Sequence, residues 1–218
     1  PARVVINLSA LRHNLNRVRT LAPHARVMAI VKTDAYGHGI ARVARELSSA
    51  DAFGVACLEE ARPLRASGIV QPVILLEGAY AAAEFPEIVQ LDLDIVVHDV
   101  TQVAMLEGAR PEKPINVWLK VDTGMHRLGV MPGIFNDAWQ RLQKCSAVAQ
   151  PVRLMTHLAT ASDRTHPMTH EQIASFNRIC GHLPVEKSIA NSAGIIGFPE
   201  SHADWVRPGL MLYGVSPL

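Results

Sequence analysis

The first sign of chemistry in this sequence is a lysine at the end of an apolar run. Lys32 closes Val27–Val31, and a turn containing Tyr36 and two glycines follows it. Partial burial at a strand end favours the neutral, nucleophilic form of an amine. Lys32 is therefore a candidate for imine formation with a carbonyl compound, and Tyr36 for bonding a phosphate on it. The alternative is a structural lysine whose stem packs while its ammonium reaches solvent.

Two later strings, NSAG and RPGLMLYG, are suited to holding that phosphate. Asn191 and Ser192 open a predicted strand-to-helix turn, and Gly209 precedes Leu210 in the second string. Glycine lets the backbone approach a ligand, and unpaired N–H groups at such turns bind anions. The alternative for the first string is an ordinary helix cap.

Three further cations follow or end predicted strands. Arg127 lies in WLKVDTGMHRLG and is a natural bidentate partner for a carboxylate or a phenolate. Lys120 is flanked by apolar residues in the same string, so it faces outward, is modified, or is paired. Arg207 precedes Pro208-Gly209 and is either a surface cation or a partner for a ring nitrogen or carboxylate.

Several other site types are excluded by spacing. Gly37-His38-Gly39 lacks the third glycine of a dinucleotide fingerprint, no P-loop is present, and Ser192 lacks the preceding glycine of a nucleophile elbow. His166 and His170 are four residues apart, but Pro167 predicts a loop before a helix, so we expect no metal site.

Composition narrows the class of partner. The net charge of +1 over 218 residues carries no signal for nucleic acid or an anionic membrane surface. Hydrophobic residues make up 49% and charged residues 19%, which favours one large core. Small molecules or other proteins are therefore the expected partners. Three scattered cysteines and no long apolar run predict a cytoplasmic protein.

The elements that must position these residues are repeated βα units. About eight apolar runs alternate with stretches of helical period, which predicts a (β/α)8 TIM-type barrel of parallel strands, with an open doubly wound sheet as the alternative. In a barrel, residues just after each strand face one mouth. The expected strands end near Lys32, Cys57, Glu77, His98, Val121, His157, Ala190 and Pro208.

The N-terminal segment does not fit this ring. Val4, Ile6 and Leu8 alternate with other residues as in a half-buried strand, and Ser9 is the expected cap of a following helix. This extra strand and helix precede the barrel, and the strand has no sheet of its own to join.

Together these strings resemble the alanine racemase family, which uses pyridoxal 5'-phosphate (PLP). The resemblance covers essentially all of residues 1–218 and rests on AIVKTDAYGHG, LKVDTGMHRLG, MTHLATAS, SIANSAGI and WVRPGLMLYG, in the family's order. Thr33-Asp34 stands where the family usually has Ala-Asn. The resemblance implies an isomerase that interconverts L- and D-alanine for peptidoglycan supply.

The resemblance also implies roles for individual residues. Lys32 would carry the cofactor, and Arg127 would contact the substrate carboxylate with help from Lys120, the counterpart of a carbamylated lysine. Arg207 would contact the pyridine nitrogen and bond to His157. The remaining cofactor-binding residues would be Tyr36, Asn191, Ser192, Gly209 and Leu210.

This sequence does not match the C-terminal β-domain of the family or the second catalytic base that this domain contributes. The family's second base is a tyrosine of a C-terminal β-domain, contributed by the partner subunit of a homodimer, and Tyr36, Tyr80 and Tyr213 do not match its position. The chain therefore resembles the barrel domain alone, with residues 1–8 as a strand that would join the absent domain. We expect little turnover from it. The alternative function is a non-catalytic PLP-binding barrel.

Overall fold

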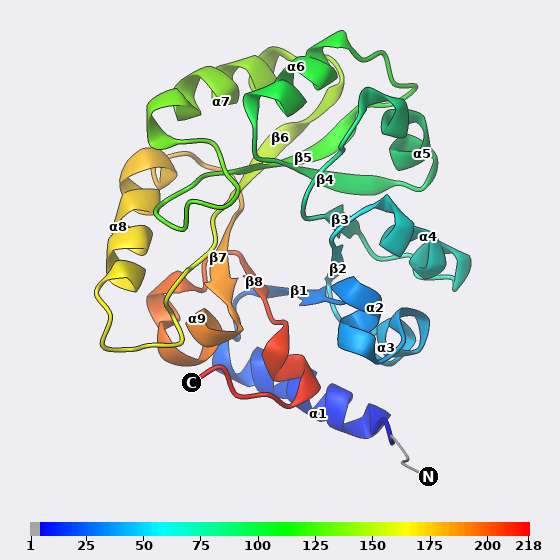
Figure 1. Ribbon diagram of the computed structural model, residues 1–218, viewed down its shortest axis with the longest axis vertical. Coiled ribbons are helices and arrows are strands. Elements are labelled where there is room, and N and C mark those ends of the chain that lie inside the picture. The colour runs from blue at the N-terminus through cyan, green and yellow to red at the C-terminus, as the bar shows by residue number, and fades with distance from the viewer. Residues whose placement is uncertain (1–4) are drawn as a thin grey trace.

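The computed structural model describes residues 5–218, which form one closed parallel barrel (Figure 1). β1 pairs with β2 on one side, with Met28 opposite Ala52, and with β8 on the other, with Val27 opposite Val206. The closed barrel confirms the predicted fold and excludes the open sheet. The strands are β1 Arg26–Ile30, β2 Ala52–Val55, β3 Val73–Leu75, β4 Leu93–Val97, β5 Ile115–Lys120, β6 Val148–Met155, β7 Lys187–Asn191 and β8 Trp205–Arg207.

The helices form an outer ring around these strands (Figure 1). They are α1 Leu8–Leu21, α3 Ile40–Glu46, α4 Leu58–Ala66, α5 Phe85–Gln90, α6 Val100–Gly108, α7 Phe135–Lys144, α8 Met168–Cys180 and α9 Ser192–Gly197, together with the single turn α2 Lys32–Gly37. Short 3-10 turns lie at η1 Ala82–Glu84, η2 Pro132–Ile134, η3 Pro199–Ser201 and η4 Leu210–Tyr213. Within residues 5–218, no helix is both long and apolar enough to cross a bilayer.

The predicted N-terminal strand is not formed in the part of it that the structure describes, and its place in an absent domain stays a prediction. Val5–Asn7 has no regular structure, and α1 begins at Leu8, while Val4 lies outside the described residues. A strand forms only where a neighbour accepts its backbone hydrogen bonds, and every barrel strand is already paired on both sides. The helix cap is Asn7 rather than Ser9, since the Asn7 side chain accepts a hydrogen bond from the Ala10 amide at 3.2 Å.

The strands read as continuous apolar runs because both of their faces are buried. One face packs against the helices, and the other fills the barrel with a separate apolar cluster. That interior cluster consists of Met28, Ile30, Ala52, Ile74, Val96, Trp118, Met155 and Trp205. It makes the barrel a solid core, so that ligands have access only at the two ends.

Paired charges close the N-terminal end of the barrel interior. Arg153 lies between two carboxylates, 3.3 Å from Asp94 and 3.0 Å from Glu186. The indole of Trp205 donates to Glu186 at 3.0 Å, and Arg26 also pairs with Glu186. The buried Asp94 and the partly exposed charges at this end therefore all have partners of opposite sign.

Candidate functional site

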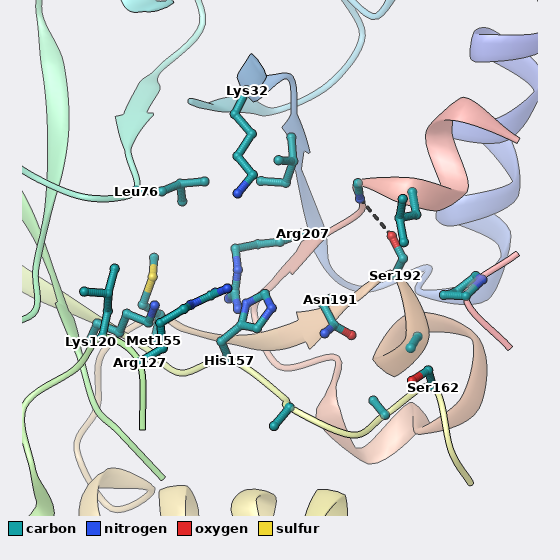
Figure 2. Close-up of a pocket in the computed structure, with 18 of the residues that line it drawn as sticks. Lys32, Leu76, Lys120, Arg127, Met155, His157, Ser162, Asn191, Ser192 and Arg207 are labelled. Carbon is teal, nitrogen blue, oxygen red and sulfur yellow. Dashed lines mark hydrogen bonds between the residues drawn. The ribbon is translucent and has the colours of Figure 1, made fainter. Parts of the chain in front are cut away.

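The candidate site is a cavity of about 410 Å³ at the C-terminal end of the strands. All ten residues singled out from the sequence line it, and Figure 2 shows Lys32, Arg127, His157 and Arg207 reaching toward it from different elements. The ten are Lys32, Tyr36, Lys120, Arg127, His157, Asn191, Ser192, Arg207, Gly209 and Leu210. Closure of the barrel brings them together, because each follows or ends a strand.

Lys32 begins an unusual turn, α2, that winds to the left. Four consecutive residues without glycine, Thr33 to Tyr36, have φ between 51° and 57°. L-residues avoid this conformation at a cost of about 1–2 kcal/mol each, so the turn needs outside support. Glu60 accepts from the Thr33 amide at 2.7 Å, and Asp34 accepts from the Ile40 amide at 2.7 Å. The turn directs both Lys32 and Tyr36 to the cavity.

The departure from the family pattern at Thr33-Asp34 is compatible with this turn. The Asp34 carboxylate accepts the Ile40 amide, a role that a side-chain amide oxygen can also take. Asp and Asn are also the residues that best tolerate left-handed conformation apart from glycine.

A group of donors and small residues forms a second part of the cavity. The Ser192 hydroxyl accepts from the Gly209 amide at 2.8 Å, drawn as the dashed line in Figure 2, and from the Met211 amide at 3.3 Å. A Cβ on Gly209 would lie 2.7 Å from the Tyr36 hydroxyl oxygen, so a side chain at this position would fill the space. Tyr36 is held by the ring of Tyr213 at 4.7 Å.

Asn191 caps α9 at the same place. Its side chain accepts from the Gly194 amide at 3.0 Å and donates to the carbonyl of Leu158 at 3.0 Å. The helix-cap interpretation of NSAG is thus confirmed. It does not exclude anion binding, because the cap fixes the turn on which Ser192 lies.

Arg207 is buried in the barrel interior, with 5% of its surface exposed. Its guanidinium donates to the Ser188 hydroxyl and to the carbonyls of Thr156 and Ile189. Within residues 5–218 it forms no hydrogen bond to His157, so that predicted bond is wrong. The reason is that these three oxygen acceptors take the Nη1 and Nη2 groups of Arg207. Burial, together with nearby cations, lowers the pKa of His157 well below its usual value.

Lys120 also faces the interior, which excludes the outward-facing alternative. It is 7% exposed, and burial, followed by the charges of Arg207 and Arg127, lowers its pKa to about 8. The nearby carboxylate of Asp122 is turned into its own loop, where it accepts from the amides of Gly124 at 2.9 Å and His126 at 3.1 Å.

Arg127 lies on the loop after β5, which is closed at its base. The amide of Asp122 donates to Val130, and the amide of Val130 donates back to Lys120, both at 2.9 Å. Gly129 is required there, because its φ is +141° and a Cβ would lie 2.5 Å from the Asp122 nitrogen. The loop carries the exposed Arg127 side chain to the cavity.

The cavity can therefore hold an anion beside an amine. It gathers Lys32, Lys120, Arg127 and Arg207, and no ion pair within residues 5–218 includes any of the four. Ile30, Leu76 and Met155 supply apolar walls. This set fits a ligand that has anionic groups and an apolar part and that lies within reach of the Lys32 amine.

The metal alternative has no support in the geometry. His166 and His170 do not share a ligand set: His166 accepts from the Met168 amide at 3.2 Å, and His170 pairs with Glu200 at 3.2 Å. The predicted loop ending at Pro167 is confirmed, since α8 starts at Met168. Among the described residues, no group of three or more His, Cys, Asp or Glu side chains is arranged to hold a metal ion.

Comparison with known proteins agrees with this geometry. The family model described as alanine racemase, N-terminal domain, matches residues 6–217. The chain belongs to the alanine racemase family. It is 52% identical over 217 residues to the biosynthetic alanine racemase of Escherichia coli strain K12 and, equally, to an alanine racemase of Shigella boydii, covering 100% of this chain and 60% of each relative.

Solved structures of the family share the fold. The biosynthetic alanine racemase from Pseudomonas aeruginosa matches with a TM-score of 0.91 and 42% identity, over 97% of this chain and 59% of that one. The alanine racemase from Corynebacterium glutamicum matches with a TM-score of 0.89 and 32% identity, over 98% and 63% of the two chains. The 218 residues thus span about 60% of the length of the curated relatives they match.

Residues that the sequence did not reveal also support the site. Tyr213 packs on Tyr36 and donates to the carbonyl of Ile30 at 2.9 Å. Thr156 and Ser188 accept the hydrogen bonds of Arg207. Each of these contacts joins strands or turns that lie far apart in the sequence, so no local pattern indicates them.

Proposed function

We propose that this chain is the PLP-binding barrel of an alanine racemase. The observation that carries the proposal is the cavity in which the Lys32 amine shares one mouth with three further cations. The same mouth holds a cradle formed by Tyr36, Ser192 and Gly209. Membership in the family and the names of the relatives support alanine as the substrate. A role in D-alanine supply and a cytoplasmic location are parts of the same proposal.

The residues of the cavity divide between the two ends of the cofactor. Lys32 would bind its carbonyl carbon covalently. The hydroxyls of Tyr36 and Ser192 and the backbone of Gly209 and Leu210 would bind the phosphate. Arg207 would face the ring nitrogen, and because a guanidinium stays charged, it would keep a proton off that nitrogen. Asn191 would hold the turn that carries Ser192.

The chemistry then depends on how this chain's residues handle charge and protons. When bound, PLP would withdraw electrons from the substrate Cα and make its proton easier to remove. The Lys32 amine would take or return that proton on one face. Arg127 would bind the substrate carboxylate. The lowered pKa of Lys120 increases the share of its neutral amine, which would add to the carbon of carbon dioxide and release one proton to water. The resulting carbamate anion would pair with Arg127.

Racemisation also needs a second group on the opposite face of Cα. Of the three tyrosines, Tyr80 donates to Glu77 and Tyr213 donates to Ile30, while Tyr36 lies beside the Gly209 cradle. We therefore propose that the second base comes from outside this barrel, in a homodimer whose partner subunit covers the cavity.

The test is covalent attachment of the cofactor. Adding PLP to the purified chain should produce a visible absorption band, and borohydride should fix the cofactor to Lys32, as read by peptide mass mapping. Lys32→Ala should abolish the adduct, and Lys113→Ala, an exposed control, should not. An adduct on other lysines alone would refute the proposal.

Turnover separates the racemase from a non-catalytic PLP-binding barrel. The isolated 218-residue chain should racemise alanine slowly, and joining it to the remaining sequence of a relative should raise the rate by orders of magnitude. No gain in the joined protein, with Lys32 still loaded, would favour the non-catalytic alternative.

A further inference from the structure

Gln172 is a buried glutamine of the outer ring whose side chain reaches the cavity wall. It lies on α8 and is 1% exposed. Its Oε1 accepts from the Ala159 amide at 2.8 Å, and its Nε2 donates to the His157 carbonyl at 2.9 Å. One side chain thus holds the backbone on both sides of residue 158, in the loop that carries His157.

The same amide nitrogen starts a directed chain of hydrogen bonds. Nε2 also donates to the Thr123 hydroxyl at 3.3 Å, and the hydroxyls of Thr123 and Thr156 lie 2.8 Å apart. Thr156 gives its only hydroxyl hydrogen to the carbonyl of Val121 at 2.9 Å. Thr123 must therefore donate its hydroxyl hydrogen to Thr156. The Thr123 oxygen can then only accept from residue 172, so residue 172 must be a hydrogen-bond donor.

The chain of bonds ends at residues that line the cavity. The carbonyl of Thr156 accepts from Arg207, and the next residue is His157. Thr123 lies on the loop, closed between Asp122 and Val130, that carries Arg127. Three separate segments, the loop that follows β6, strand β8 and the loop after β5, thus meet through one network.

We propose that Gln172 is a positioning residue: through Thr123 and Thr156 it fixes His157, Arg127 and Arg207 relative to one another. The proposal deepens the proposed function, on which its consequence for cofactor binding rests. Gln172 itself contacts backbone and Thr123 rather than the cavity contents.

Gln102 provides a matched control on the other side of the barrel. It lies on α6, is 7% exposed, and makes the same kinds of bonds. Its Oε1 accepts from the His98 amide at 2.8 Å, and its Nε2 donates to the carbonyls of Glu77 at 3.1 Å and Ala79 at 3.2 Å. It therefore joins two loops as Gln172 does, but its bonds lead to none of the four cations.

The experiment compares Gln172→Met with Gln102→Met in the cofactor-free chain and with PLP. Without cofactor, the NMR titration midpoint of the His157 imidazole should rise in Gln172→Met, because the ring leaves its buried position near Arg207, Lys120, Arg127 and Lys32. It should stay unchanged in Gln102→Met. With PLP, the dissociation constant should rise about tenfold in Gln172→Met and less than about twofold in the control.

Amide exchange reports whether each variant has lost the intended bonds. Exchange should accelerate at Ala159 in the first variant and at His98 in the second. Thr123→Val, which cuts the network at a half-buried residue and leaves both glutamines, should shift the His157 midpoint in the same direction by a smaller amount. It serves in place of Gln172→Met if that variant does not fold.

An unchanged His157 midpoint in both Gln172→Met and Thr123→Val would overturn the proposal, as would equal effects of the two glutamine substitutions. A wild-type chain without a PLP adduct on Lys32 would overturn the proposed function instead. The titration in the cofactor-free chain would still decide the role of Gln172.

Discussion

The two ends of the barrel interior hold buried charges in opposite ways. At the N-terminal end, Arg153 is bonded to Asp94 and Glu186, so the charge that folding removes from water is compensated by partners at 3.3 Å and 3.0 Å. At the C-terminal end, Lys120 and Arg207 are buried close enough to lower the pKa of Lys120, and no carboxylate pairs with either of them among the described residues.

This difference assigns the N-terminal end of the barrel to stability and the C-terminal end to ligand binding. Buried cations without an anion nearby reduce folding stability. Groups whose pKa is shifted in this way are typical of sites where a bound ligand supplies the negative charge. The phosphate of PLP and the carboxylate of an amino acid are both anions that would do so. We therefore expect substitutions of cations at the two ends to change stability with opposite sign.

The largest change in the free energy of unfolding is expected at the N-terminal end, where the charges are paired. Arg153→Met should lower the free energy of unfolding by about 3 kcal/mol, because it leaves the buried Asp94 without its charged partner, while Glu186 keeps Arg26. Urea unfolding at neutral pH measures it. Arg62→Met is the control, because Arg62 forms an ion pair with Glu87 at the surface and should lose less than about 1 kcal/mol. Equal losses in the two variants would contradict the comparison.

A gain in the free energy of unfolding is expected at the C-terminal end, where Lys120 and Arg207 have no carboxylate partner within residues 5–218. Lys120→Met should raise the free energy of unfolding of the cofactor-free chain at pH 7 by about 2 kcal/mol, because it removes a buried cation. Lys120 has a pKa of about 8 in the fold and about 10.5 when unfolded, so its charged form is the costly one. Wild-type stability should therefore approach that of the variant as pH rises from 8 to 10.5.

Unfolding of both proteins across that pH range, in buffer free of carbon dioxide, measures this difference. Lys113→Met is the control: Lys113 pairs with Asp92 at the surface, and its substitution should give no gain. A Lys120→Met variant that is less stable than wild type at pH 7 would mean that Lys120 has an anionic partner.

A smaller effect should come from inorganic phosphate. At a concentration about ten times its dissociation constant, phosphate should stabilise the cofactor-free chain by about 1.4 kcal/mol, because it binds only the folded cavity. Chloride at equal ionic strength is the salt control. Arg153→Met should keep the gain, and Ser192→Ala should reduce it. The same gain with chloride would indicate general screening rather than a phosphate site.

The sequence predicted the elements of this barrel well because their patterns are local. Strands buried on both faces are continuous apolar runs, so all eight expected ends fall within about two residues of the observed ones. The residues just after those runs then lie at one mouth by topology alone, which is why all ten candidates line a single cavity.

Features that depend on distant partners could not be predicted in this way. The left-handed turn at Thr33–Tyr36 contains no glycine and is held by Glu60. The acceptors of Arg207 come from β7 and from Thr156, the residue directly after β6. The expected N-terminal strand also depends on a distant partner, since alternation at Val4, Ile6 and Leu8 says nothing about an available neighbour.

The smallest expected effect tests how closely the C-terminal end is packed. Gly209→Ala should cost about 1 kcal/mol in the cofactor-free chain, because its Cβ would lie 2.7 Å from the Tyr36 oxygen and Tyr213 blocks the ring's retreat. Tyr36→Phe removes that oxygen and leaves the nearest ring carbon at 3.5 Å, an ordinary contact. The double variant should therefore lose less than the sum of the single variants.

Gly133→Ala controls for the general effect of replacing glycine, since a Cβ there meets nothing within 4 Å. Strict additivity of Gly209→Ala and Tyr36→Phe would mean that Tyr36 moves freely, and the cradle would then form only around a bound phosphate. Non-additivity would mean that the cradle is already built in the empty barrel, in keeping with an end whose buried cations are held in place without an anionic partner in the described part of the chain.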